Sequence, residues 1–105
     1  MASIIRRKGR HRSRIEIVAN ILEIAKNGAR KTRIMYLGNL SFELLEKYLD
    51  MLSTCGLLQR QNDPDGTYVV TEKGQRFLED YYELEKNSEI VESKKRALER
   101  NLTGP

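Results

Sequence analysis

Positively charged side chains near the start of the chain are the residues best suited to bind a partner. Six arginines and lysines and one histidine fall within the first fourteen positions with no acid among them: Arg6, Arg7, Lys8, Arg10, His11, Arg12 and Arg14. A short cationic arm of this kind attracts polyanions such as nucleic acid. The alternative is a tail that only improves solubility.

The net charge of +4 is unevenly distributed along the 105 residues. Residues 1–71 contain 12 basic and 7 acidic side chains, whereas residues 72–105 contain 7 basic and 8 acidic ones. The excess positive charge therefore lies in the first two thirds of the chain, where we expect a polyanion to bind.

Catalysis finds no support in the composition. The single histidine and the single cysteine, Cys55, cannot supply a nucleophile, a base and an orienting group together. They also exclude an internal disulfide and a cysteine-based zinc site. We expect a protein that is not an enzyme and holds no metal or other cofactor, with Cys55 as a buried filler at a helix end.

The hydropathy pattern indicates neither a secretion signal nor a membrane span. Residues 1–5 are too short for the apolar region of a signal peptide, and no apolar run later in the chain reaches the length of a membrane helix. The sequence therefore predicts a cytoplasmic protein without a membrane partner.

Two short helices are predicted in the first forty residues. The first begins near Ser13 and stops at Asn27-Gly28, with apolar residues at helical spacing between them. After a bridge at residues 29–31, Thr32 is the expected N-cap of a brief helix that ends at Gly38-Asn39.

The third predicted helix has the clearest local signals. Ser41 is the expected N-cap, and Leu40 and Leu45 are spaced as a hydrophobic staple. Gly56 suits the left-handed position after the last turn. The apolar stripe expected on this helix consists of Leu44, Leu45, Tyr48, Leu49 and Leu52.

A β-hairpin and a long helix complete the chain. Residues 57–61 and 67–70 read as strands joined by Asn-Asp-Pro-Asp-Gly at 62–66, a sequence rich in turn formers. Two short strands do not form a stable sheet alone, so they must pack on the helices, with the 29–31 bridge as a candidate third strand. Thr71 then caps a helix that continues to about Asn101.

Three short helices, a hairpin and another helix form the element order of a winged helix-turn-helix domain. The predicted fold class is mainly α, of the α+β type, with this domain followed by a long carboxy-terminal dimerisation helix. The predicted organisation is a basic flexible arm at residues 1–12, the domain at 13–71 and a coiled-coil helix at 72–102.

Several runs of residues also resemble a known family. They are Lys31–Tyr36, Asn39–Ser41, Lys47–Leu52, Gly56–Leu58 and Thr71–Gly74. These runs are similar to the small archaeal winged-helix DNA-binding proteins of the "ten-a" chromatin type, over roughly residues 13–100. The resemblance implies a homodimer joined by an antiparallel coiled coil, which binds double-stranded DNA as a nucleoid component or a transcriptional regulator. The arm upstream of Arg14 extends beyond this pattern.

Residues expected to contact DNA lie on the arm, around the two helices of the motif and on the wing. They are Arg6, Arg7, Lys8, Arg10, Arg12, Arg30, Lys31, Thr32, Arg33, Ser41, Phe42, Lys47 and Arg60. The acids Glu43, Glu46 and Asp50 oppose Lys47 on the presumed recognition helix, which also lacks the usual readers of guanine and adenine. Binding driven by the DNA backbone fits better than strong sequence specificity. Tyr48 is expected in the core, whereas Tyr36 either packs under the turn or projects toward a phosphate.

The long helix needs a partner for its apolar edge. Its apolar residues follow a four-three alternation that lapses at Ser88 and Lys95. Phe77 and Leu78 are expected to face the domain, and Tyr82 to open the interface with a second copy. The residues assigned to this homodimer interface are Tyr81, Leu84, Ile90, Val91, Leu98 and Leu102. An acid-rich segment (79–85) and a base-rich one (94–100) favour an antiparallel pair.

Three binding functions remain open from the sequence. The first is a homodimeric protein that binds double-stranded DNA in the nucleoid. The second is an adaptor whose acidic third helix docks on a basic protein partner, and the third is RNA binding through the arginine arm. The sequence does not decide between gene regulation and DNA packaging, nor does it identify an operator or an effector.

Overall fold

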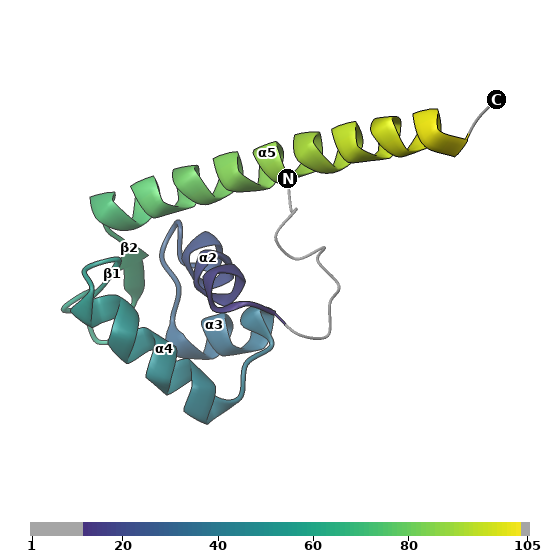
Figure 1. Ribbon diagram of the computed structural model, residues 1–105. Coiled ribbons are helices and arrows are strands. Elements are labelled where there is room, and N and C mark those ends of the chain that lie inside the picture. Colours follow the sequence, from purple (N-terminus) through teal and green to yellow (C-terminus); the bar gives the residue numbers. More distant parts are fainter. Residues whose placement is uncertain (1–11, 104–105) are drawn as a thin grey trace.

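The computed structural model describes residues 12–103, which form four helices and one two-stranded sheet (Figure 1). In chain order the elements are α2 (Arg14–Ile24), α3 (Lys31–Gly38), α4 (Phe42–Thr54), β1 (Leu58–Arg60), β2 (Tyr68–Val70) and α5 (Glu72–Thr103). This order confirms the winged helix-turn-helix domain followed by a long helix. The hairpin lies against one end of α4, and α5 runs across the top of the domain and beyond it (Figure 1).

The predicted helix starts depend on local capping, and three of the four are confirmed, including Thr71 before α5. Ser13 caps α2 in a complete capping box with Glu16, and the Ser41 hydroxyl accepts a hydrogen bond from the Leu44 amide at the start of α4. Thr32 was the wrong N-cap for α3, because the N-cap is Arg30 and the helix begins at Lys31, two residues earlier than predicted. Arg30 provides no side-chain cap, so the first amides of α3 are not covered by its own cap residue.

The turn between α3 and α4 ends α3 at the predicted place. Asn39 adopts the left-handed conformation at φ 53° and ψ 52°, which asparagine tolerates better than most residues. The amide of Leu40 then donates to the Met35 carbonyl, and Leu40 is buried. These contacts set the short turn of the helix-turn-helix motif.

The wing is an antiparallel hairpin, with Leu58 opposite Val70 and Arg60 opposite Tyr68. The residue expected to extend this sheet does so as a single bridge, in which Ala29 and Tyr68 exchange backbone hydrogen bonds of 3.0 and 2.8 Å. The wing is thereby attached to the segment that leads into α3.

One hydrophobic core joins the helices, the wing and the first turns of α5. Ile21, Leu22, Ile34, Leu45, Leu52 and Leu78 are its most fully buried large side chains. Gly74 allows α5 to approach the wing closely, because a Cβ there would overlap the Leu57 carbonyl oxygen and lie 2.7 Å from Val70 Cγ1. The core therefore continues past residue 71 into the long helix.

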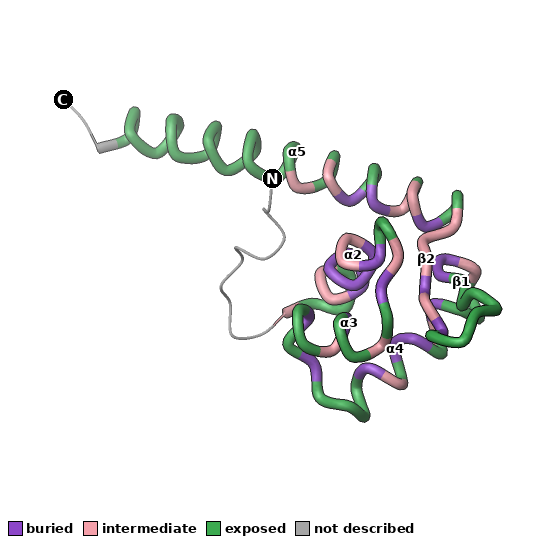
Figure 2. Tube along the Cα trace, turned by 180° about the vertical axis from the view of Figure 1, so that it is seen from behind, coloured by how far each residue is buried: buried purple, intermediate pink, exposed green. Residues whose placement is uncertain are grey.

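Burial along α5 changes abruptly after its fourth turn (Figure 2). Leu78 is fully buried, Tyr81 is 5% exposed, and the Tyr82 hydroxyl donates to the Glu23 carboxylate of α2. Every residue from 86 to 102 is exposed. The dimer-interface prediction is therefore corrected for Tyr81, whose ring belongs to the core of its own chain because α2 and α5 pack directly together.

Other side chains differ from the sequence-based expectation. Cys55 is exposed rather than a buried filler, because the C-cap of α4 lies at the surface. Leu44 is 36% exposed and lies outside the hydrophobic core cluster, although it was placed in the apolar stripe of α4. Tyr48 is buried as expected.

Candidate nucleic-acid interface

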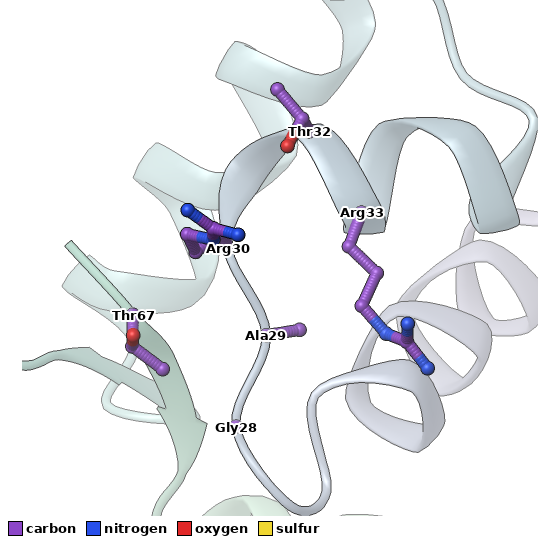
Figure 3. A pocket seen from close by; sticks show the side chains of 6 residues that line it. All are labelled: Gly28, Ala29, Arg30, Thr32, Arg33 and Thr67. Carbon is purple, nitrogen blue, oxygen red and sulfur yellow. The ribbon is translucent and has the colours of Figure 1, made fainter. Parts of the chain in front are cut away.

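The amino-terminal end of α3 forms one side of a hollow of about 380 Å³ (Figure 3). Its lining residues are Gly28, Ala29, Arg30, Thr32, Arg33 and Thr67. The guanidinium groups of Arg30 and Arg33 lie on opposite sides of the backbone at Ala29 (Figure 3). Two cations, two hydroxyls and the positive end of a helix dipole together suit an anion such as a phosphate.

Lys31 is held by α4 rather than projecting freely from α3. Its Nζ lies 2.5 Å from the Glu46 carboxylate and 5.7 Å from the centre of the Phe42 ring. The hydrogen bond with Glu46 raises the pKa of Lys31 above its usual value. Lys31 thus ties the two helices of the motif together, and one of the three acids expected to repel DNA is neutralised.

The wing supplies a counter-charge to the same region. Arg30 Nη1 lies 3.8 Å from the Asp65 carboxylate, with both side chains well exposed. A surface ion pair at this distance is weak and yields readily to a competing phosphate. Arg60, expected as a wing contact, lies over Gly66 at the tip of the hairpin, where a Cβ would meet its guanidinium.

The tip of the wing is organised by Asp63. Its Oδ1 accepts hydrogen bonds from the amides of Gly66 and Thr67, at 2.6 and 3.1 Å. The Thr67 amide is the main reason why the pKa of Asp63 lies below its usual value. This turn places Thr67 beside the hollow at the start of α3.

The amino-terminal half of α4 presents the remaining predicted contacts. Ser41 is used as a cap, Phe42 is 59% exposed, and Lys47 is exposed and makes no ion pair within residues 12–103. Glu43 is also exposed and acidic. The face therefore offers one free cation and one aromatic ring, with little capacity to read bases.

The basic arm is described only at its last residues. Arg12 donates a hydrogen bond of 3.0 Å to the carbonyl oxygen of Gly38, at the end of α3. This contact directs Arg12 toward the turn of the motif. The predicted contacts Arg6, Arg7, Lys8 and Arg10 lie outside the described residues.

Tyr36 resolves an alternative that the sequence left open. Its side chain is 83% exposed, one turn along α3 from Thr32 and Arg33. Its exposure shows that the ring does not pack under the turn, and its spacing from Thr32 and Arg33 is that of residues which share a helix face. Sequence reasoning missed Thr67 and Asp65, because only the folded wing brings them to α3.

A family model described as winged helix-turn-helix matches residues 11–89. The chain belongs to the winged helix-turn-helix family. An uncharacterized protein of Methanocaldococcus jannaschii, MJ0287, is 37% identical over 84 residues, covering 79% of this chain and 80% of that protein. A second uncharacterized protein from the same organism, MJ0290, is 34% identical over 74 residues, but the chain spans only 34% of its length.

Solved structures share this winged helix-turn-helix fold. Sso10a-2, a DNA-binding protein from Sulfolobus solfataricus, is similar with a TM-score of 0.77 and 28% identity, over 90% of this chain and 100% of that one. A MarR family transcriptional regulator from Silicibacter pomeroyi matches in fold with a TM-score of 0.61 and 18% identity, over 74% of this chain and 58% of the other. The expected resemblance to small archaeal DNA-binding proteins is thus confirmed.

Two further findings bear on the class of this winged helix-turn-helix protein. Among residues 12–103, no helix is long and apolar enough to cross a membrane. Within the same range, histidine, cysteine and acidic side chains form no cluster that could hold a metal ion. The fold is that of winged helix-turn-helix proteins, and Sso10a-2, which shares it, is a DNA-binding protein.

Proposed function

We propose that this protein binds double-stranded DNA as a homodimer. The observation that supports it best is the hollow at the start of α3, where Arg30, Thr32 and Arg33 surround helix amides beside the exposed end of α4. In helix-turn-helix proteins such a site holds a phosphate while the second helix of the motif lies in the major groove.

Backbone contacts supply most of the affinity in this proposal. Arg33 makes no ion pair within the described residues, and Arg30 has only the weak pair with Asp65. Lys31 acts mainly by fixing α3 against α4, since Glu46 and Phe42 hold its ammonium group. The arm residues Arg6, Arg7, Lys8, Arg10 and Arg12 and the wing residue Arg60 add charge along the duplex.

Dimerisation through α5 follows from its exposed apolar edge. Leu84, Val91, Leu98 and Leu102 are 51–80% exposed on α5 within the part of the chain that the structure describes. Ile90 is also exposed, and together these five residues form the proposed interface. The opposed charge segments favour an antiparallel pair. We further propose the division into a basic arm (1–12), a DNA-binding domain (13–71) and a dimerisation helix (72–102), with the protein acting in the nucleoid of the cytoplasm as a regulator or a chromatin component.

The test is duplex binding measured against salt with a matched pair of arginine variants. Arg33→Gln should weaken binding to all duplexes alike, and the slope of log affinity against log salt should fall by about two per dimer, because each copy loses one phosphate contact. Arg76→Gln removes an exposed arginine of α5 outside the hollow and should change neither quantity.

Two results would contradict the proposal. One is the absence of duplex binding at low salt, and the other is equal loss of affinity in both arginine variants. A genomic footprint separates the two roles: a discrete protected site indicates a regulator, and uniform coverage indicates a packaging protein.

A protein adaptor remains the second candidate, supported by the acidic and aromatic surface of α4. Glu43 and Asp50 are exposed without an ion pair within residues 12–103, on the helix that also carries the exposed ring of Phe42. The charge reversal Glu43→Lys should strengthen duplex binding if α4 faces DNA, whereas it should abolish capture of a basic partner if α4 faces protein. Glu46 is unsuitable for this test because it holds Lys31.

A further inference from the structure

An apolar groove lies on the domain where α2, the end of α4 and the start of α5 meet. Its volume is about 510 Å³, and it is lined by Arg14, Ile15, Val18, Met51, Leu52, Cys55, Leu57 and Phe77. Ile15 is 50% exposed there, although it belongs to the apolar face of α2. None of its lining residues is among those proposed to contact DNA.

Phe77 connects this groove with the exposed apolar edge of α5. Leu84 and Val91 follow Phe77 at intervals of seven residues, so the three side chains lie along one slowly turning stripe of the helix. Phe77 is half-buried against the core, whereas Leu84 and Val91 are 55% and 51% exposed. A partner that covers this stripe therefore also contacts the groove, because Phe77 belongs to both.

The charges on α5 indicate how far a second copy reaches. In an antiparallel pair that sets Leu102 opposite Phe77, the acid-rich segment 79–85 of one helix lies opposite the base-rich segment 94–100 of the other. Leu98 then lies next to Tyr81 and the groove. The helix end also carries the negative end of its dipole toward Arg14 on the groove rim.

We propose that the carboxy-terminal end of α5 of a second copy docks across Phe77 into this groove through Leu98 and Leu102. The inference rests on the proposed homodimer and adds a contact between each helix end and the partner's domain. The docked end touches α2 and α4 together, so dimerisation fixes the orientation of the helix-turn-helix relative to the coiled coil. Leu98 and Leu102, which are 66% and 80% exposed in a single chain, become buried.

The native cysteine provides a direct test, because Cys55 lines the groove and is the only cysteine in the chain. A short thiol-reactive photo-crosslinker is attached to Cys55 in a mixture of isotope-labelled and unlabelled protein. The cross-links are mapped by mass spectrometry, and sedimentation measures the dimer. We expect links between chains to residues 98–103, whereas Gln59→Cys in a Cys55→Ser background, on the exposed wing, should give none there.

A second measurement does not depend on the attached label. Ile15→Ala shortens an exposed side chain in the groove and should weaken the dimer by about tenfold, since each copy loses apolar contact. Leu37→Ala removes another exposed apolar side chain, 43% exposed on α3 outside the groove, and should leave the dimer unchanged.

The outcomes separate this inference from the homodimer itself. The docking is overturned if the dimer is stable but Cys55 cross-links to residues other than 98–103, or if Ile15→Ala leaves the dimer affinity unchanged. Either result leaves the homodimer standing. Links within one chain to residues 1–11 would mean that the arm, through Ile4 and Ile5, occupies the groove instead. A protein that stays monomeric overturns both proposals.

Discussion

The two halves of α5 have the same backbone conformation but different support. Between Glu72 and Glu85, Gly74, Leu78 and Tyr81 are buried against the domain, and the helix is capped by Thr71. Between residues 86 and 102 every side chain is exposed. The near half is thus specified by packing on its own domain, whereas the far half is left uncovered by the rest of residues 12–103.

This difference separates the part of α5 that packs in the fold, up to residue 85, from the part available for contact with another molecule, from residue 86 onward. Helices depend mainly on packing of an apolar face, because propensity alone leaves short helices marginal in water. The far half still carries Val91, Leu98 and Leu102 at heptad-like spacing. Its apolar side chains are therefore best explained by a contact outside the chain.

The largest expected effect comes from truncating one leucine in each half. Leu78→Ala opens a cavity in a fully buried site and should lower the free energy of unfolding by about 2–5 kcal/mol at any protein concentration. Leu98→Ala should leave stability almost unchanged in dilute solution, within about 0.5 kcal/mol. It should instead reduce the rise in Tm that dimerisation gives to the wild type as concentration increases.

Thermal unfolding at several protein concentrations measures both variants. A wild-type Tm that is independent of protein concentration would contradict a role of the far half of α5 in dimerisation. A Leu98→Ala variant that is strongly destabilised in dilute solution would show that the far half packs within its own chain.

Two substitutions to alanine, one in each half of α5, should change the free energy of unfolding by smaller amounts and in opposite directions. Gly74→Ala forces a Cβ into the Leu57 carbonyl and should destabilise the fold by about 1–3 kcal/mol, although alanine favours helices. Asn87→Ala is at an exposed position and should stabilise the helix by up to about 0.7 kcal/mol. Denaturant unfolding checks both, and stabilisation by Gly74→Ala would mean that α5 stands off from the wing.

The smallest effect concerns the wing, on which the near half of α5 packs, and tests how protonation of Asp63 changes it. The pKa of Asp63 is lowered by the hydrogen bonds that its carboxylate accepts from the Thr67 and Gly66 amides. These bonds therefore stabilise the fold fully above pH 3.8, the usual pKa of the group. The stabilisation is lost as the pH falls through the lower pKa of the folded state. The NMR signals of the Gly66 and Thr67 amides should therefore shift with a midpoint below pH 3.8. Asp63→Asn should abolish this transition, and a midpoint at or above 3.8 in the wild type would contradict it.

Much of the fold could be predicted because its signals are local. Ser13 and Ser41 indicate helix starts because their hydroxyls accept hydrogen bonds from amides of the first turn. Asn39 and Gly56 indicate helix ends because they tolerate the left-handed conformation. The position of the hairpin follows from the turn formers at 62–66. Thr32 was mistaken for a cap because α3 starts without a side-chain cap at all.

The candidate site was less predictable because its contacts join distant segments. The Lys31–Glu46 pair links residues fifteen positions apart, and the Arg30–Asp65 pair depends on the docked wing. Tyr81 fits the coiled-coil spacing, yet the packing of α2 on α5 places it in the core. Composition gave the right type of residue near α3 but could not show which cations were already engaged.

The length of α5 also has a consequence for the geometry of DNA. Leu78 marks the point where the helix is anchored on its domain. In the proposed register, the partner's anchor point lies opposite Asn101, so the two domains are separated along the helix pair by about 35 Å at 1.5 Å per residue. One turn of B-DNA spans about 34 Å. The exposed half of the helix would then space the two domains by about one helical turn of a duplex.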